Sequence, residues 1–275
     1  MSLAERRIAF IGGGAMAEAL AGGLIAGGIS AVQIRIAEPR PERCTQLRER
    51  HGVAAGADYA DAVRDSDLIV LAVKPGVIPT ALAALRAEDL DLTTPLWISI
   101  AAGVRLASLE AGLSSEARII RAMPNTPALV GAGATAICGN ARVNASDRSD
   151  ARSLFESVGI AWEAEAENLL DVVTGLSGSG PAYVFLFLEA LIDAGEQAGL
   201  PRNAAEQFAT QTVYGAAKLA RDSDSSPAQL REQVSSPGGT TLAGLAALDE
   251  GGFREILTRA VAAATRRSEE LGEDS

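Results

Sequence analysis

Residues 8–21 read IAFIGGGAMAEALA, and this stretch decides the fold prediction. Its first four residues are apolar, as in a buried strand, and the residues from Ala15 onward favour a helix. The turn between them fits the G-x-G-x-x-G/A pattern with Gly12, Gly14 and Ala17. The first glycine of that pattern makes a tight turn, the second lets a pyrophosphate approach the backbone, and the small third residue lets the helix pack on the sheet. Strand, turn and helix together predict a dinucleotide-binding unit.

Further strand patterns follow along the first half of the chain. They are rich in Ile, Val and Leu without clean alternation, which is typical of strands buried on both faces and hence of a parallel sheet. They lie at residues 7–11, 32–37, 68–73, 96–100, 118–122, 133–138 and 159–163, with helical patterns at 15–26, 41–50 and 78–85 between them. This alternation predicts an α/β domain with a doubly wound sheet over residues 1–164.

The second half has a different character. Helical patterns cover residues 169–191, 203–220, 227–234, 241–248 and 253–271, and no strand pattern interrupts them. We expect an all-α domain over residues 165–275. Its long apolar stretches are hard to cover within one protomer, so we expect a homodimer.

Composition excludes several classes of function. A formal net charge of −11 argues against nucleic acid, which binds to basic surfaces. Two cysteines, Cys44 and Cys138, are too few for a disulfide framework or a zinc site, so we expect a reducing, cytoplasmic setting and no metal. No apolar run follows the first basic residues, and the most apolar segment, residues 183–192, contains Glu189 and is about half as long as a membrane span. We expect no signal peptide and no membrane partner.

The carboxyl ends of the predicted strands carry small or kinked residues. The segments 74–76 (KPG), 101–103 (AAG) and 123–127 (MPNTP) each follow a strand. Ligands of open α/β sheets bind outside these strand ends, so the segments predict a groove for the rest of a dinucleotide.

The residues after the second strand bear on the choice of cofactor. An acidic residue here accepts hydrogen bonds from the adenosine ribose and disfavours a 2′-phosphate, whereas an arginine does the reverse. Glu38 favours NADH, and Arg40 and Arg43 permit NADPH. The cofactor is predicted to be NADH or NADPH, with the choice open.

Strong acid–base groups are scarce. The single histidine, His51, falls in a predicted loop at the surface, and we find neither a Ser-His-Asp set nor a Tyr-x-x-x-Lys pattern. A carbonyl reductase needs an acid to protonate its alkoxide, whereas a protonated imine is already electrophilic at carbon. The sequence favours reduction of C=N over C=O.

Two loops of the helical half suit an anionic small molecule. The stretch SSPGGTT at 235–241 precedes a helix, where free N–H groups and the helix dipole favour a carboxylate. A second stretch, SGSGPAY at 177–183, is expected to open the long apolar helix in the same manner, with Pro181 in its first turn. Both stretches are also compatible with ordinary helix caps.

Six motifs resemble those of one family of reductases. FIGGGAMA, AVKP, SIAAG, RAMPNTPALV, GLSGSGPAYVF and SSPGGTT occur in the order and spacing of pyrroline-5-carboxylate reductases, over nearly the whole chain. The resemblance implies an N-terminal Rossmann domain and a C-terminal dimerisation domain of the 6-phosphogluconate dehydrogenase type, with a ring of dimers in many members. It implies hydride transfer from NADH or NADPH to the C=N bond of L-1-pyrroline-5-carboxylate, the last step of proline biosynthesis.

Carried over by position, the resemblance assigns a set of site residues. Together with Glu38, the implied cofactor contacts are Ile11, Gly12, Gly13, Gly14, Ala15, Met16, Ala72, Val73, Lys74, Pro75, Ser99, Ile100, Ala101, Ala102 and Asn125. The implied contacts of the imino acid substrate are Ser236, Gly238, Gly239, Thr240 and Thr241. Thr241 is the implied catalytic group, hydrogen-bonded to the ring nitrogen, with a bound water as a second possible source of the proton. Glu38 and Tyr59 depart from residues common in relatives, and both departures concern the adenosine end of the cofactor.

Two alternative functions stay open. A related imine or β-hydroxyacid reductase could use the same scaffold, and the second of these should offer a catalytic lysine in its helical domain, for which Lys218 is the only candidate. A non-catalytic NAD(P)H sensor would bind the cofactor and turn nothing over. The complete substrate loop argues against the sensor.

Overall fold

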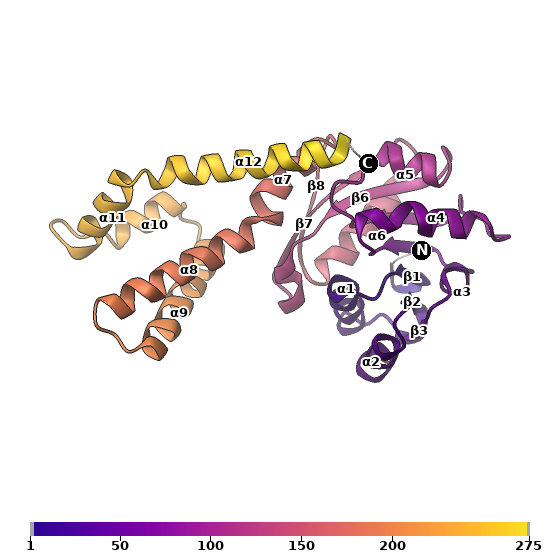
Figure 1. Cartoon of the computed structure of the whole chain (residues 1–275), viewed down its shortest axis with the longest axis horizontal. Coiled ribbons are helices and arrows are strands. Elements are labelled where there is room, and N and C mark those ends of the chain that lie inside the picture. Colours follow the sequence, from indigo (N-terminus) through magenta and orange to yellow (C-terminus); the bar gives the residue numbers. More distant parts are fainter. Residues whose placement is uncertain (1–2, 274–275) are drawn as a thin grey trace. The chain divides into compact units, whose positions relative to one another are not determined.

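The structure, a computed structural model, describes residues 3–273 and contains an eight-stranded sheet with helices on both faces (Figure 1). The strands are β1 (Ile8–Ile11), β2 (Ile34–Ala37), β3 (Ala54–Gly56), β4 (Leu68–Leu71), β5 (Leu96–Ser99), β6 (Arg118–Met123), β7 (Gly133–Gly139) and β8 (Gly159–Glu163). The α-helices between and after them are α1 (Ala15–Ala26), α2 (Pro41–His51), α3 (Tyr59–Val63), α4 (Ile78–Arg86), α5 (Leu106–Gly112), α6 (Ala145–Glu156) and α7 (Leu169–Val173).

The strand order is β3-β2-β1-β4-β5-β6-β7-β8. Every neighbouring pair is parallel except β6 and β7, which run antiparallel. The chain winds outward from β1 in both directions, so the predicted doubly wound α/β fold is confirmed.

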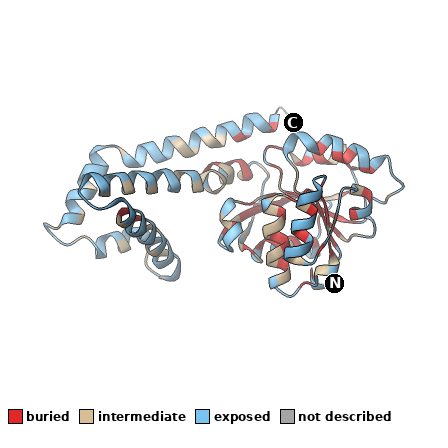
Figure 2. Ribbon diagram, turned by 60° about the horizontal axis from the view of Figure 1, so that its bottom comes forward, coloured by how far each residue is buried: buried red, intermediate tan, exposed pale blue. Residues whose placement is uncertain are grey.

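Both faces of the sheet are buried, which explains the unbroken apolar strands. Alternate residues of a strand point to opposite faces. In β1, Ile8 and Phe10 belong to a core cluster with residues of α1, α2 and α6, whereas Ala9 and Ile11 belong to a second cluster with residues of α3, α4 and α5. Figure 2 shows the buried residues gathered in this part of the chain. Trp97 of β5 is fully buried and donates its indole N–H to the Leu92 carbonyl at 2.9 Å.

Contacts between residues divide the chain into two compact units. The first reaches to Ser179 and includes the last turns of α12 from Ala262, and the second covers Gly180–Val261. The second unit contains α8 (Gly180–Gln197), α9 (Arg202–Asp222), α10 (Pro227–Gln233), α11 (Thr240–Glu250) and the first part of α12 (Phe253–Glu273). The sequence pattern puts a boundary after residue 164, where β8 has just ended, and that boundary stays a prediction.

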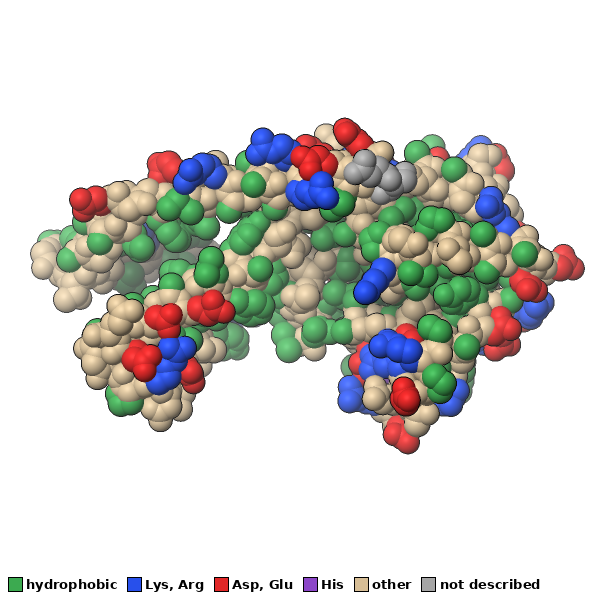
Figure 3. Space-filling model, in the orientation of Figure 1, with side chains coloured by type: hydrophobic (Ala, Val, Ile, Leu, Met, Phe, Trp, Pro, Cys, Tyr) green, Lys and Arg blue, Asp and Glu red, His purple; other side chains and the backbone are tan. Residues whose placement is uncertain are grey.

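The helices of the second unit expose large apolar side chains in the single chain. Figure 3 shows hydrophobic side chains at the surface of these helices. The most exposed include Phe185, Leu186, Phe208, Tyr214 and Leu219, at 55–69%. Exposed apolar patches of this kind mark surfaces that pack against another protein chain.

One helical stretch, Leu169–Gln197, is long and apolar enough to cross a membrane by length and composition alone. Its most apolar window has a mean hydropathy of 1.3, and 6% of it is buried. A helix that packs at a protein interface passes the same test, so this is weak evidence for a membrane span.

Candidate active site

The predicted cofactor segments begin at one edge of the sheet. Ile11 at the end of β1 pairs with Leu71 of β4, and Leu71 pairs with Ser99 of β5. Ser99 pairs in turn with Arg121, two residues before the end of β6. Ala37 at the end of β2 pairs with Ile11 as well, so the structure brings together, at the carboxyl ends of five strands, the segments that the sequence assigns to the cofactor.

The glycine-rich loop packs backbone to backbone against the AVKP segment. Gly12 has φ of +104°, and a Cβ there would lie 2.7 Å from the Ala72 carbonyl oxygen. The Gly12 amide donates to the Ala37 carbonyl at 2.8 Å, and the Ala72 amide donates to Ile11 at 2.8 Å. A side chain at position 12 would be strained and would push these segments apart, so glycine is required here.

The start of α1 has the features of a pyrophosphate site. Gly14 precedes the helix with no side chain to cap it, and a Cβ on Gly14 would meet nothing within 4 Å. Ala17 is fully buried, which lets α1 lie close to the sheet. The helix has 12 residues, and its first N–H groups and dipole favour an anion. The backbone at Gly14 is therefore open to the approach of a dinucleotide pyrophosphate.

Glu38 lies directly behind this loop, just after β2. Its carboxylate accepts hydrogen bonds from the Gly13 amide at 3.1 Å, from the Arg40 amide at 3.0 Å and from Arg40 Nε at 2.8 Å. Burial raises the pKa of this carboxyl, but the hydrogen bonds from Arg40 and Gly13 lower it more, so its pKa lies below the ordinary glutamate value. Glu38 is ionised at neutral pH, and its side chain is 5% exposed.

A second carboxylate, Glu18 of α1, contacts basic side chains of α2. It pairs with Arg43 at 2.6 Å and Arg50 at 2.7 Å, and it lies 3.2 Å from His51 Nε2. The expectation that His51 is a loop residue at the surface is wrong: it is the last residue of α2, and its side chain is 17% exposed. Gly52 in the left-handed conformation ends the helix after it, and glycine there is an ordinary helix-ending signal.

The side chains of the remaining cofactor candidates differ in their exposure and in their hydrogen bonds. Ser99 is fully buried, and its hydroxyl accepts from the Ala101 amide at 3.4 Å. Lys74 is exposed. Both polar atoms of the Asn125 amide have a partner in the protein, because Nδ2 donates to the Ser177 carbonyl at 3.0 Å and Oδ1 accepts from the Ala134 amide at 2.9 Å. The Asn125 side chain thus connects the end of β6 to the SGSGP segment, a role that the sequence did not predict.

The SGSGP segment joins α7 to α8. Residues Thr174–Gly178 form one turn of π-helix between α7 and α8, and the Ser179 amide donates to the Thr174 carbonyl at 2.8 Å. Helix α8 begins at Gly180 with Pro181 in its first turn, as predicted, and an anion site at this position stays a prediction. π-turns inside helices are frequent at functional sites.

The SPGGTT loop does present a free helix start. It joins α10 to α11 in the second unit, with Gly238 at φ +70° and Gly239 as the residue before the helix. The Gly239 amide donates to the Ser236 carbonyl at 3.0 Å. Within residues 3–273, neither the Thr240 nor the Thr241 hydroxyl makes a hydrogen bond. This start of α11 can bind a carboxylate through backbone N–H groups and has two hydroxyls to offer.

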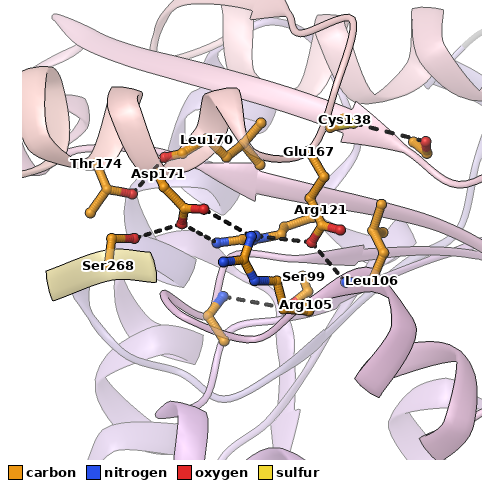
Figure 4. A network of polar contacts seen from close by, with 12 residues as sticks. Ser99, Arg105, Leu106, Arg121, Cys138, Glu167, Leu170, Asp171, Thr174 and Ser268 are labelled. Atoms are coloured by element: carbon orange, nitrogen blue, oxygen red, sulfur yellow. Dashed lines mark hydrogen bonds and ion pairs between the residues drawn. The ribbon is translucent and has the colours of Figure 1, made fainter. Parts of the chain in front are cut away.

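A buried charge network behind β6 escaped the sequence analysis (Figure 4). Arg121 of β6 is 2% exposed and pairs with Glu167 at 2.9 Å and with Asp171 of α7 at 3.4 Å. Asp171 also accepts from Arg105 at 2.8 Å and from the Ser268 hydroxyl of α12 at 2.8 Å. Arginine inside the apolar strand RIIRAM was the available signal, because a buried arginine needs a buried carboxylate.

Two family models match the chain. Residues 167–271 match pyrroline-5-carboxylate reductase dimerisation, and residues 7–103 match NADP oxidoreductase coenzyme F420-dependent. The first match covers most of the helical half, whose exposed apolar side chains suit a dimer.

Curated relatives match over almost the full length. A pyrroline-5-carboxylate reductase of Synechocystis is 47% identical over 267 residues, which are 97% of this chain and 98% of the relative. One from Pseudomonas aeruginosa is 44% identical, with 97% of each chain covered.

Two solved structures of pyrroline-5-carboxylate reductases also resemble this chain. A pyrroline-5-carboxylate reductase from Coxiella burnetii has a TM-score of 0.92 at 39% identity, covering 97% of this chain and 98% of that one. One from Plasmodium falciparum, solved with NADP bound, has a TM-score of 0.85 at 34% identity and covers 98% of both chains.

Proposed function

The chain belongs to the pyrroline-5-carboxylate reductase family, and we propose that it transfers a hydride from NADH or NADPH to the C=N bond of L-1-pyrroline-5-carboxylate, giving L-proline. The observation that carries the proposal is the SPGGTT loop. It offers a glycine-lined helix start and unbonded threonine hydroxyls in a chain whose sheet edge fits a dinucleotide. The substrate has a carboxylate and a ring nitrogen, which match these two kinds of group.

In this account residues 1–164 bind the cofactor and residues 165–275 bind the substrate and dimerise. The bound cofactor supplies the hydride from its nicotinamide ring. The start of α1 binds the pyrophosphate, the segments after β4 and β5 contact the rest of the dinucleotide, and Asn125 keeps the end of β6 in place. The residues Ile11–Met16, Ala72–Pro75 and Ser99–Ala102 are the proposed cofactor contacts.

Substrate binding depends on the backbone of Gly238, Gly239 and Thr240, with Ser236 beside them. The Thr241 hydroxyl holds the ring nitrogen, so that hydride adds to the adjacent imine carbon while the nitrogen keeps a proton. A protonated imine needs little acid catalysis, and binding in the correct orientation accounts for most of the rate. This explains how an enzyme with one histidine can perform the reaction.

A pair of substitutions at Thr241 tests the proposal. Thr241→Val removes the hydroxyl and keeps the shape, and we expect kcat/KM for pyrroline-5-carboxylate to fall about tenfold to a hundredfold, the range for one hydrogen bond to a charged group. Thr241→Ser keeps a hydroxyl and should retain most of the activity. Thr258→Ala is the control, because this hydroxyl of α12 is exposed and donates to the Arg254 carbonyl of its own helix. Equal kinetics for the valine and serine variants would remove Thr241 from the mechanism.

The assembly we propose is a homodimer in the cytoplasm, joined by the exposed apolar helices and extended in solution to a ring of dimers. The dimerisation match over residues 167–271 and the exposed side chains of the second unit support the dimer. Light scattering on the purified chain measures the mass directly, and a monomer at micromolar concentration would contradict the dimer.

The β-hydroxyacid alternative has lost its main support. Lys218, its only candidate for a catalytic lysine, is exposed on α9 and pairs with Asp222 one turn later. A panel of cyclic imino acids and hydroxy acids separates the two reactions.

A further inference from the structure

The structure bears on the choice between NADH and NADPH through the surroundings of Glu38. In this fold the residue at the end of the second strand meets the adenosine ribose. The Glu38 carboxylate is held there by the amide of the glycine-rich loop and by Arg40, and it is nearly inaccessible to solvent. Its position is therefore fixed before any cofactor binds.

The two arginines that could attract a 2′-phosphate are already paired. Arg40 forms two contacts with Glu38, from Nε at 2.8 Å and from Nη2 at 3.2 Å. Arg43 is 16% exposed and donates from Nε to the Gly13 carbonyl at 2.7 Å and from Nη2 to Glu18 at 2.6 Å. Each guanidinium is thus bound to a carboxylate of the protein.

The third guanidinium nitrogen of Arg43 also has a hydrogen-bond partner. Nη1 donates to Gln46 at 3.2 Å, so all three guanidinium nitrogens have partners, one of them a backbone carbonyl of the glycine-rich loop. We interpret Arg43 as a residue that stabilises the glycine-rich loop. Turning it toward a phosphate would break these hydrogen bonds and leave Glu18 with the exposed Arg50 and with His51.

We propose that Glu38 makes this chain selective for NADH: its ionised carboxylate, fixed at the end of β2, disfavours the 2′-phosphate of NADPH. A phosphate placed at the ribose 2′ position would meet an ionised carboxylate that cannot move away without giving up its bonds to Gly13 and Arg40. The Glu38 side chain is shielded from water, so a repulsion between the two negative charges is weakened less by solvent there than at the surface.

The proposal rests on the dinucleotide site of the proposed function and not on the identity of the imino acid. Equilibrium titration of the full chain with NADH and with NADPH, followed by nicotinamide fluorescence, tests it without a substrate. We expect NADH to bind at least about tenfold more tightly than NADPH, as for loss of one charged hydrogen bond.

Glu38→Gln supplies the direct test. The variant keeps the size of the side chain and an acceptor for the Gly13 amide, but it loses the charge and frees Arg40. We expect the ratio of the two dissociation constants to move toward NADPH by at least about tenfold. Glu49→Gln, an equal charge change at an exposed position of α2, should leave the ratio unchanged.

Arg40→Ala distinguishes selection by Glu38 from binding of the 2′-phosphate by Arg40. This test does not depend on the folding of the Glu38 variant. If Glu38 decides, removing the exposed Arg40 changes the ratio less than about fivefold, as for a surface ion pair. If Arg40 instead turns outward and binds the 2′-phosphate, wild-type protein binds NADPH at least as tightly as NADH, and Arg40→Ala loses NADPH selectively. That result overturns the proposal.

The titrations test the role of Glu38 independently of the reaction, so either hypothesis can fail without the other. Selective NADH binding without reduction of pyrroline-5-carboxylate would sustain the role of Glu38 and overturn the reaction. Reduction of pyrroline-5-carboxylate with a preference for NADPH would do the reverse.

Discussion

Replacing Asp171 by asparagine should destabilise the chain strongly. Asp171 is fully buried and accepts three hydrogen bonds, from Arg105, Arg121 and Ser268. Asparagine has nearly the same shape but loses the charge and turns an NH₂ group toward these donors. Arg121 would keep only Glu167, which is 25% exposed.

The size of the effect follows from that geometry. Removing one partner of a buried ion pair costs about 3–5 kcal/mol of unfolding free energy. Glu167 still compensates Arg121, so we expect the lower end, about 3 kcal/mol. With urea m-values of about 1–3 kcal/mol per M, the unfolding midpoint should fall by about 1 M or more.

Urea denaturation followed by circular dichroism, at one protomer concentration for all variants, measures this shift. A fixed concentration is needed because subunit association contributes to apparent stability. Asp222→Asn is the matched control: Asp222 also has two basic partners, Lys218 and Arg221, but lies exposed on α9. We expect no measurable shift for the control. A midpoint for Asp171→Asn equal to that of the control would refute the idea that this buried network stabilises the first unit.

Two further predictions concern the site itself. Asn125→Ala removes the hydrogen bonds to Ser177 and Ala134, and we expect it to weaken NADH binding and to lower the urea midpoint, whereas Asn125→Asp, which keeps the acceptor for the Ala134 amide, should lose less. Unchanged binding and stability in the alanine variant would contradict the connecting role. Glu38 should stabilise the protein in a pH-dependent way, because its folded-state pKa is lowered. Its contribution is complete above the unfolded-state pKa of about 4.3 and is lost as the pH falls through the folded value. The difference in midpoint between wild type and Glu38→Gln should be constant from pH 7 down to about 5 and shrink below about 4; a difference that grows in acid would contradict this account.

The parts predicted correctly from sequence are those with strong local patterns. The apolar run ending in Ile11, the glycine pair Gly12 and Gly14, and the strand ends after Leu71 and Ser99 each specify their local geometry, and parallel pairing then aligns them. The helix start after Gly239 was predictable for the same reason.

What escaped prediction depends on contacts between distant residues or on weak local signals. Strand β3 is three small residues, Ala54–Gly56, and only pairing with β2 makes it a strand. The reversal of β7 depends on the turn Thr126–Val130, which no periodicity reveals. The π-turn at Thr174–Gly178 lies inside residues 169–191, for which the sequence predicted one continuous helix.

Ion pairs are the feature of the structure that was hardest to predict from the sequence. Arg43 lies 25 residues from Glu18, and Arg121 lies 50 residues from Asp171, so neither pair can be read from spacing. Sequence alone left Glu38 and the arginines as competing signals. Their actual partners in the fold decide what each can still bind.

The most direct test of the central claim is oxidation of NADH and of NADPH, measured in parallel with L-1-pyrroline-5-carboxylate as substrate and with L-proline quantified as product. We expect turnover, one proline formed for each cofactor oxidised, and a higher kcat/KM with NADH. Binding of either cofactor without any turnover would contradict the claim that this chain is a pyrroline-5-carboxylate reductase.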